Sequence, residues 1–265
     1  MMVRLKAVWR AAKAVLLLAA AFVVTAYFVL PLAWKHYEHE PALEGLSMRT
    51  KTAQNIPGDP LNIGLIGDKD EVSAAFQRIG WVSADALGVK SDLEIAGSVV
   101  LDRPYVNAPV SSLYYEGRAE DMAFEKSVGA SADQRHHIRL WNVLDTSADG
   151  RPLWLGAVSF DKGVGFSHFT GQITHHIDGN LDAERDGLVK DLADARIVTR
   201  LFQVSGIGPT LTGRNGGGDS FFTDGEVTVA TLSHDSKPDA GPPDILENPP
   251  LVRLKQTIWA AFAAH

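Results

Sequence analysis

The longest apolar stretch in the chain lies near its N-terminus. Residues 14–34 form a run of 21 residues without a charged side chain. A helix needs about 20 residues to cross about 30 Å of hydrocarbon, so we predict a transmembrane helix over 14–34, preceded by a short segment, residues 1–13. Positive charge favours the cytoplasmic side of a membrane, which places that segment in the cytoplasm. Its basic residues are Arg4, Lys6, Arg10 and Lys13.

This orientation puts the remainder of the chain on the extracytoplasmic side. The alternative is a signal peptide that is removed by cleavage. The apolar run is longer than that of a usual signal peptide, and Tyr27, Trp34 and Tyr37 lie toward its far end. Aromatic side chains favour the membrane interface, so an uncleaved single-pass anchor is the favoured interpretation.

Beyond the apolar run, the composition divides the chain into a body and its connections. Residues 35–60 are mixed and polar, and prolines bound their central part, which predicts a linker. Residues 61–233 have the patterning of a folded domain. A second linker, rich in Pro and Asp, is predicted over 234–250. Residues 251–265 place apolar side chains at helical spacing and predict a helix that either docks on the body or lies at the membrane interface.

The start of the body predicts a strand followed by a helix. Residues 61–67 are a short apolar run typical of a buried strand, and Asp68 and Glu71 have the spacing of a capping box. The apolar residues that follow have helical spacing as far as Gly80, which ends the helix. A second capping pattern at Ser91–Glu94 predicts another helix.

From residue 109 onward the apolar residues alternate with a period of two, which predicts strands. Asp149–Gly150 is a turn signal between two of these segments and predicts a hairpin. Residues 180–195 predict a helix with acidic residues in its first turn. We therefore expect an α+β domain, with an antiparallel or mixed sheet and packed helices. The predicted strands lie within 110–117, 121–126, 135–144, 152–160, 195–206 and 221–233.

Composition excludes several kinds of site. The chain has no cysteine, so disulfides, thiolate metal sites and thiol nucleophiles are excluded. Without residues 1–13, the chain has 21 Lys and Arg against 32 Asp and Glu, a net charge of −11. Such a surface repels polyanions, so we expect no nucleic-acid partner.

Five of the nine histidines lie between His136 and His176, which makes this the best region for a candidate site. If residues 135–144 form a strand, neighbouring side chains point to opposite faces. His136 then shares a face with Ile138 and Leu140. The opposite face carries Arg135, His137 and Arg139.

The second histidine pair is expected to divide in the same way. His175 shares a face with Ile173 and Ile177, and His176 lies on the polar face of the same strand. His137 and His176 are therefore the predicted pair on the polar face.

Three interpretations of this region remain open from the residues alone. In the first, the histidines have no ligand, and their ring nitrogens form hydrogen bonds at the edge of the core and on a polar surface. Alternatively, the polar-face residues form a pocket for an anionic ligand such as a lipid phosphate headgroup, because guanidinium groups match phosphate and carboxylate geometry. The candidate ligand-binding residues are Arg135, His137, Arg139, His176 and Arg118, with His168 as a further neighbour.

The third interpretation is a hydrolytic zinc site. His137, His168, His176 and Asp161 would supply three nitrogens and one oxygen, a common ligand set for zinc. Their spacing matches no recognised zinc motif, and nearby arginines would oppose a cation. We therefore expect no metal or other cofactor, with zinc as the alternative. The glycine-rich segment 213–219 lacks the Lys-Ser/Thr of a phosphate-binding loop and predicts a hairpin connection.

Several segments of the chain, taken together, resemble the LssY C-terminal domain family of bacterial envelope proteins. The segments are NAPVSSLYYEGRAEDMAFEK, QRHHIRLW, PLWLGAVSFDKGVGFSH and TGQITHHIDGNLDAERDGLV, and the similarity covers roughly Leu61 to Leu232. The resemblance implies a bacterial inner-membrane protein, because longer relatives carry this domain behind DedA-like and type 2 phosphatidic acid phosphatase regions. It also implies a role in envelope lipid metabolism.

The chain has one predicted span and none of the phosphatase motifs, so the phosphatase activity of those relatives does not transfer to it. The resemblance assigns no catalytic residue. The expected partners are the lipid bilayer and either a lipid phosphate or other membrane proteins, the latter if the domain is a non-catalytic interaction module.

Overall fold

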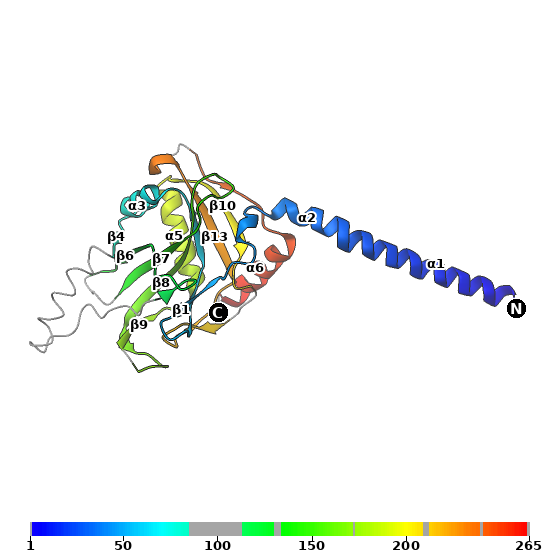
Figure 1. Ribbon diagram of the computed structural model, residues 1–265, viewed down its shortest axis with the longest axis horizontal. Coiled ribbons are helices and arrows are strands. Elements are labelled where there is room, and N and C mark those ends of the chain that lie inside the picture. Colours follow the sequence, from blue (N-terminus) through cyan, green and yellow to red (C-terminus); the bar gives the residue numbers. More distant parts are fainter. Residues whose placement is uncertain are drawn as a thin grey trace, which may run out of the picture.

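A computed structural model of the protein describes residues 2–84, 113–129, 134–171, 173–208, 212–238 and 241–263. Helix α1 (Met2–Val24), a π-helical turn (Thr25–Val29) and α2 (Leu30–Tyr37) follow one another without a break. Within them, Trp9–Tyr37 is long and apolar enough to cross a membrane, and none of its most apolar window is buried against the body. Figure 1 shows this helix extending away from the folded domain.

The body is built on a mixed sheet of nine strands among the described residues. Its order is β14-β10-β13-β3-β8-β7-β6-β4, and β9 pairs with the extended part of β8. The pairs β13–β3 and β10–β14 are parallel, and the other pairs are antiparallel. The strands are β3 (Ile63–Ile66), β4 (Val82–Ser83), β6 (Met122–Ser127), β7 (Arg135–Leu144), β8 (Leu153–Phe166), β9 (Ile173–Ile177), β10 (Val198–Ser205), β13 (Glu226–Leu232) and β14 (Asp244–Ile245).

Both faces of this sheet are covered, so the central strands are buried on both sides. Helices α3 (Lys69–Arg78) and α5 (Leu181–Asp194) cover one face, where Ile138 and Leu140 join the core cluster. The opposite face carries a second cluster that includes Trp141. The α+β class expected from the sequence, with a mixed sheet and packed helices, is confirmed.

A small second sheet covers the face that carries Trp141. It has the order β2-β1-β5 and consists of β1 (Arg49–Thr52), β2 (Pro57–Pro60) and β5 (Leu113–Tyr114). Two of these strands lie in residues 35–60, where a linker was expected, along with a 3-10 turn at Pro41–Leu43. The expectation was wrong there because the polar residues Thr50, Thr52 and Asp59 are buried rather than solvated.

Local sequence signals account for several of these elements. Glu71 accepts a hydrogen bond from the backbone N–H of Asp68, as the capping-box spacing predicts. The hairpin through Asp149–Gly150 is confirmed by the β7–β8 pairing. Segment 213–219 is also a hairpin connection, between β11 (Gly213–Arg214) and β12 (Ser220–Phe221). The helix expected from Ser91 lies outside the described residues.

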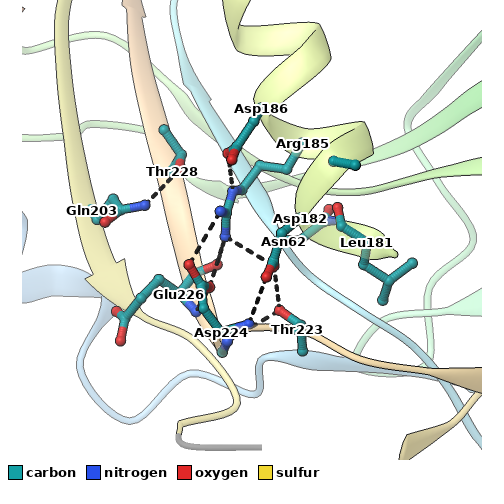
Figure 2. A network of polar contacts seen from close by, with 12 residues as sticks. Asn62, Leu181, Asp182, Arg185, Asp186, Gln203, Thr223, Asp224, Glu226 and Thr228 are labelled. Atoms are coloured by element: carbon teal, nitrogen blue, oxygen red, sulfur yellow. Dashed lines mark hydrogen bonds and ion pairs between the residues drawn. The ribbon is translucent and has the colours of Figure 1, made fainter. Parts of the chain in front are cut away.

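An ionic network around Arg185 joins α5 to the turn before β13 (Figure 2). Arg185 is 2% exposed, and its guanidinium makes two hydrogen bonds to the carboxylate of Asp224, of 2.8 and 3.2 Å. The same side chain donates to Asp186 at 2.8 Å and to the carbonyl of Glu226 at 3.0 Å. Burial alone would lower the pKa of Arg185, but the Asp224 and Asp186 carboxylates outweigh it and raise the pKa.

The C-terminal helix α6 (Pro250–Ala263) docks on the body beside this network. Lys255 forms an ion pair with Glu226, and the indole N–H of Trp259 donates to Asp182 at 3.1 Å. Helix α6 therefore docks on the body as expected, but its contacts are made by the polar group of Lys255 and by Trp259. Three other residues of the predicted apolar stripe point outward, since Leu251, Leu254 and Ile258 are each more than half exposed.

Candidate functional site

The candidate site lies on the face of β7 and β8 that is covered by the small sheet. Arg135 pairs directly across the two strands with Asp161, and His137 pairs with Ser159. Directly opposed residues project from the same face of a sheet, so these side chains form one polar group within the second core face. Arg139 continues the row and is 6% exposed.

Three of these residues, His137, Arg139 and Asp161, line a small cavity of about 40 Å³. Since one water needs roughly 10–15 Å³ by the same measure, the cavity has room for about three water molecules or one small polar group. It opens between β1, β7, β9 and the loop before β12. Its charged and amide lining comprises Asp59, His137, Arg139, Asp161, His175 and Asn215.

Asp161 is the anionic centre of the cavity, and its side chain is fully buried. Arg135 Nε donates to its Oδ2 at 3.1 Å, and His137 Nδ1 lies 3.0 Å from its Oδ1. Burial would raise the pKa of Asp161, but His137, His175 and Arg135 outweigh burial and hold the pKa well below its usual range. Asp161 is therefore ionised at neutral pH.

The pKa of Asp59 shifts in the opposite direction, although Asp59 lines the same cavity. Burial raises the pKa of Asp59, and the negative charge of Asp161 raises it further. Arg139, His137 and the amide of Asn215 act against this rise without cancelling it. Two carboxyl groups in one cavity whose pKa values are moved apart are a common arrangement for acid–base chemistry.

His137 is held between an acid and a hydroxyl group. Its Nδ1 faces Asp161, and its Nε2 lies 3.2 Å from Ser159 Oγ. A carboxylate at Nδ1 favours the tautomer in which Nε2 can accept a proton. Ser159 is only 2% exposed and is not among the residues lining the cavity. Asp161 and Ser159 therefore fix the orientation of the His137 ring. Ser159 is not exposed to the cavity and does not serve as a nucleophile for a ligand there.

The second histidine of the cavity is His175, and the predicted pairing of His137 with His176 is wrong. The alternation within β9 is as expected, and Ile177 pairs directly with Asp161 on β8. His175 shares the face of Ile177 and therefore lies on the side of Asp161, where Arg135 Nη2 approaches its Nε2 to 3.5 Å. His176 instead turns to Asp219, with 2.7 Å between His176 Nδ1 and Asp219 Oδ1.

The structure separates the remaining candidates from the cavity. Arg118 is half exposed at the far end of β7, where it donates to the carbonyl of Asn142 at 2.8 Å. His136 lies on the helix-covered face and pairs with Glu184 at 2.7 Å. The proposed zinc ligands are divided as well, since His137 and Asp161 line the cavity while His168 and His176 lie beside Asp219.

Carboxylates also contact the two arginines that were expected to face a ligand. Arg135 pairs with Glu125 at 2.9 Å in addition to Asp161. Arg139 lines the cavity and lies 3.6 Å from Glu120, a side chain that is 28% exposed. Arg139 is therefore the arginine that a small ligand in the cavity could reach.

Sequence reasoning missed two parts of the site. Asp59 lies in a segment expected to be a linker, and no feature of its neighbours distinguishes it. Asn215, Gly216 and Gly217 belong to the glycine-rich connection, whose hairpin was predicted but whose position at the cavity was not. A methyl group added at Gly216 would lie 2.4 Å from the side chain of Thr52, so this loop approaches β1 closely only because of its glycine.

Fold and site together define an α+β domain with a buried acid–base cavity, attached to an apolar helix that is long enough to span a membrane. The chain belongs to the LssY C-terminus family, whose model matches residues 42–227. No curated protein and no solved structure matches the chain.

Proposed function

We propose that this protein is a membrane-anchored envelope domain that binds a small anionic group, such as the phosphate of a lipid headgroup, in the cavity beside Arg139. The observation that carries the proposal is the convergence of Arg139, His137 and His175 on one small cavity. The guanidinium of Arg139 and the imidazole of His175 offer hydrogen bonds to phosphate oxygens, and His137 lines the same cavity.

The charge balance of the cavity supports an anion despite its two carboxyl groups. Arg135 already neutralises Asp161. The raised pKa of Asp59 favours its protonated form, which donates a hydrogen bond instead of repelling an anion. The bound group would replace the half-buried carboxylate of Glu120 as the partner of Arg139.

The apolar helix supports attachment to a bacterial inner membrane, with the body on the extracytoplasmic side. The basic residues before the helix favour this orientation. Helix α6 supports a position close to the bilayer, because its residue Val252, with Pro249 just before the helix, lines a cavity of about 360 Å³ together with Trp34 and Tyr37 at the end of α2. A Lys190→Cys variant should react with a membrane-impermeant thiol reagent in intact spheroplasts, and labelling only after lysis would contradict the orientation.

The binding proposal is tested on the full chain in detergent micelles by melting temperature and calorimetry. Inorganic phosphate is expected to raise the melting temperature relative to chloride at equal ionic strength, because a ligand that binds only the folded state stabilises it. The effect should strengthen as the pH falls, because burial raises the pKa of Asp59 and its protonated form does not repel an anion. Micelles containing phosphatidic acid, compared with glycerol phosphate, separate a lipid headgroup from free phosphate.

Two arginine variants provide the matched comparison. Arg139→Gln should abolish the phosphate effect, whereas Arg118→Gln should retain it, because Arg118 lies at the other end of β7. Equal responses of the two variants, or no response of the unaltered chain to any of the phosphates, would refute anion binding in this cavity.

A further inference from the structure

A second cluster of ligating side chains lies beside the cavity and takes no part in the proposed anion binding. His168, His176 and Asp219 each offer one ligand atom, and these atoms all lie within 4.8 Å of one another. His176 Nδ1 is 2.7 Å from Asp219 Oδ1, and His168 Nε2 is 3.7 Å from the same oxygen. From these residues we infer a binding site for a divalent transition metal, with zinc as the best fit.

The separations suit a tetrahedral ion. With zinc bonds of about 2.0–2.2 Å, neighbouring ligand atoms lie roughly 3.3 Å apart. His176 and Asp219 must separate slightly to admit the ion, and His168 must approach. His168 can do so readily, because its side chain is 60% exposed. Two imidazoles and a carboxylate are a ligand set that favours zinc over magnesium or calcium.

The carboxylate is already oriented by groups outside the ligand set. Asp219 Oδ2 accepts a hydrogen bond from the backbone N–H of Ile177 at 3.2 Å, which turns Oδ1 toward the histidines. The backbone N–H of Asp219 donates to Asn215 Oδ1 at 2.9 Å. Such outer contacts fix the direction of a metal ligand before the ion arrives.

Glycines make room for both imidazoles. A Cβ atom at Gly165 would lie 2.4 Å from His176 Nε2, so the ring lies flat over the strand only because residue 165 has no side chain. A Cβ at Gly218 would lie 2.6 Å from the Cβ of His168, and Gly218 has a φ of +91°, which favours glycine. The glycine-rich connection thus shapes the cluster as well as the neighbouring cavity.

Three protein ligands leave the fourth tetrahedral position open to water. The site therefore differs from a closed structural zinc site and can present a bound water or an anionic oxygen at the surface. Arg214 is nearby, since its Nη1 donates to the carbonyl of Gly218 at 2.6 Å. Its charge lowers the affinity for the ion and favours an anion as the fourth ligand.

The test is metal binding by the full, tag-free chain in detergent after treatment with a chelator. Zinc titration should show one ion bound per chain, and cobalt in its place should give the visible absorption of a tetrahedral site. His168→Ala should weaken binding by at least about tenfold. Because His168 is mostly exposed, this variant should fold normally, which melting in the absence of metal will confirm.

His136→Ala is the control, because His136 pairs with Glu184 on the opposite face of the sheet. It should bind zinc as the unaltered chain does. Failure of the unaltered chain to bind zinc, or equal affinities of the His168 and His136 variants, would overturn the inference. Arg139→Gln should also keep the zinc, so a missing metal site and a missing anion site are distinguishable.

Discussion

Two buried ionic clusters lie in the same domain, and they differ in what surrounds them. Around Arg185, the guanidinium has partners on all three nitrogens, and the cluster joins α5 to the turn before β13 (Figure 2). Around Asp161, a comparable set of charges lines a cavity that is open at one side. Both clusters contain buried carboxyl groups, so burial and charge alone do not distinguish them.

The difference shows which of the two can have a function beyond stability. In the Arg185 cluster, the protein itself supplies the hydrogen-bond partners of the guanidinium. A ligand could bind there only by displacing one of these hydrogen bonds. In the Asp161 cluster, Arg139, His175 and Asp59 face a space large enough for a small group. A buried ion pair is poor support for function, and a cavity beside one is better support.

The largest expected effect is the loss of Arg185. Arg185→Leu leaves the buried carboxylate of Asp224 without its two hydrogen bonds, and breaking a buried ion pair in this way costs about 3–5 kcal/mol. Urea unfolding of the purified chain measures the change. Lys190→Ala is the control on the same helix and should leave the midpoint unchanged, because the Lys190–Asp194 pair is exposed. A midpoint for Arg185→Leu close to the control would show that this cluster contributes no stability.

A smaller loss is expected for Asp161→Asn. The amide keeps a hydrogen-bond acceptor for Arg135 but removes the charge that balances the guanidinium, which costs about 2–3 kcal/mol at pH 7. The pKa of Asp161 is lowered by folding, so its contribution to stability is present above the unfolded pKa and is lost as the pH falls. The free energy of unfolding should therefore fall less between pH 7 and pH 3 in the variant than in the unaltered chain. An equal fall in both would contradict the lowered pKa of Asp161.

The contrast between the clusters also bears on what the sequence could predict. Alternation along 135–144 correctly separated His136 from His137, because side-chain direction in a strand depends only on parity. Which face of β9 meets the cavity depends on how β9 pairs with β8, and the pairing of Ile177 with Asp161 gave His175 the place expected of His176. No pattern in the residues themselves specifies this pairing.

Asp59 and Asn215 illustrate a second limit. Both lie in segments rich in proline or glycine, where polar residues usually face water. Here the small sheet and the glycine-rich connection fold over β7 and bury them at the cavity. Long-range contacts of this kind bring together residues that are more than 150 positions apart, and local patterns contain no information about them.

The smallest expected effect, and the one that most directly tests the open cavity, is that of Asp59→Asn. Folding raises the pKa of Asp59, so the unaltered chain loses stability as the pH rises through that value, where the buried carboxyl must ionise. An amide cannot ionise, so the variant should be more stable than the unaltered chain by about 0.5–1 kcal/mol at pH 8 and equal to it at pH 3, below the pKa of an unfolded aspartate. Melting curves at these two pH values measure the difference. If the variant were less stable at pH 8, Asp59 would be an ionised partner of Arg139, and the cavity would be a closed cluster like that of Arg185.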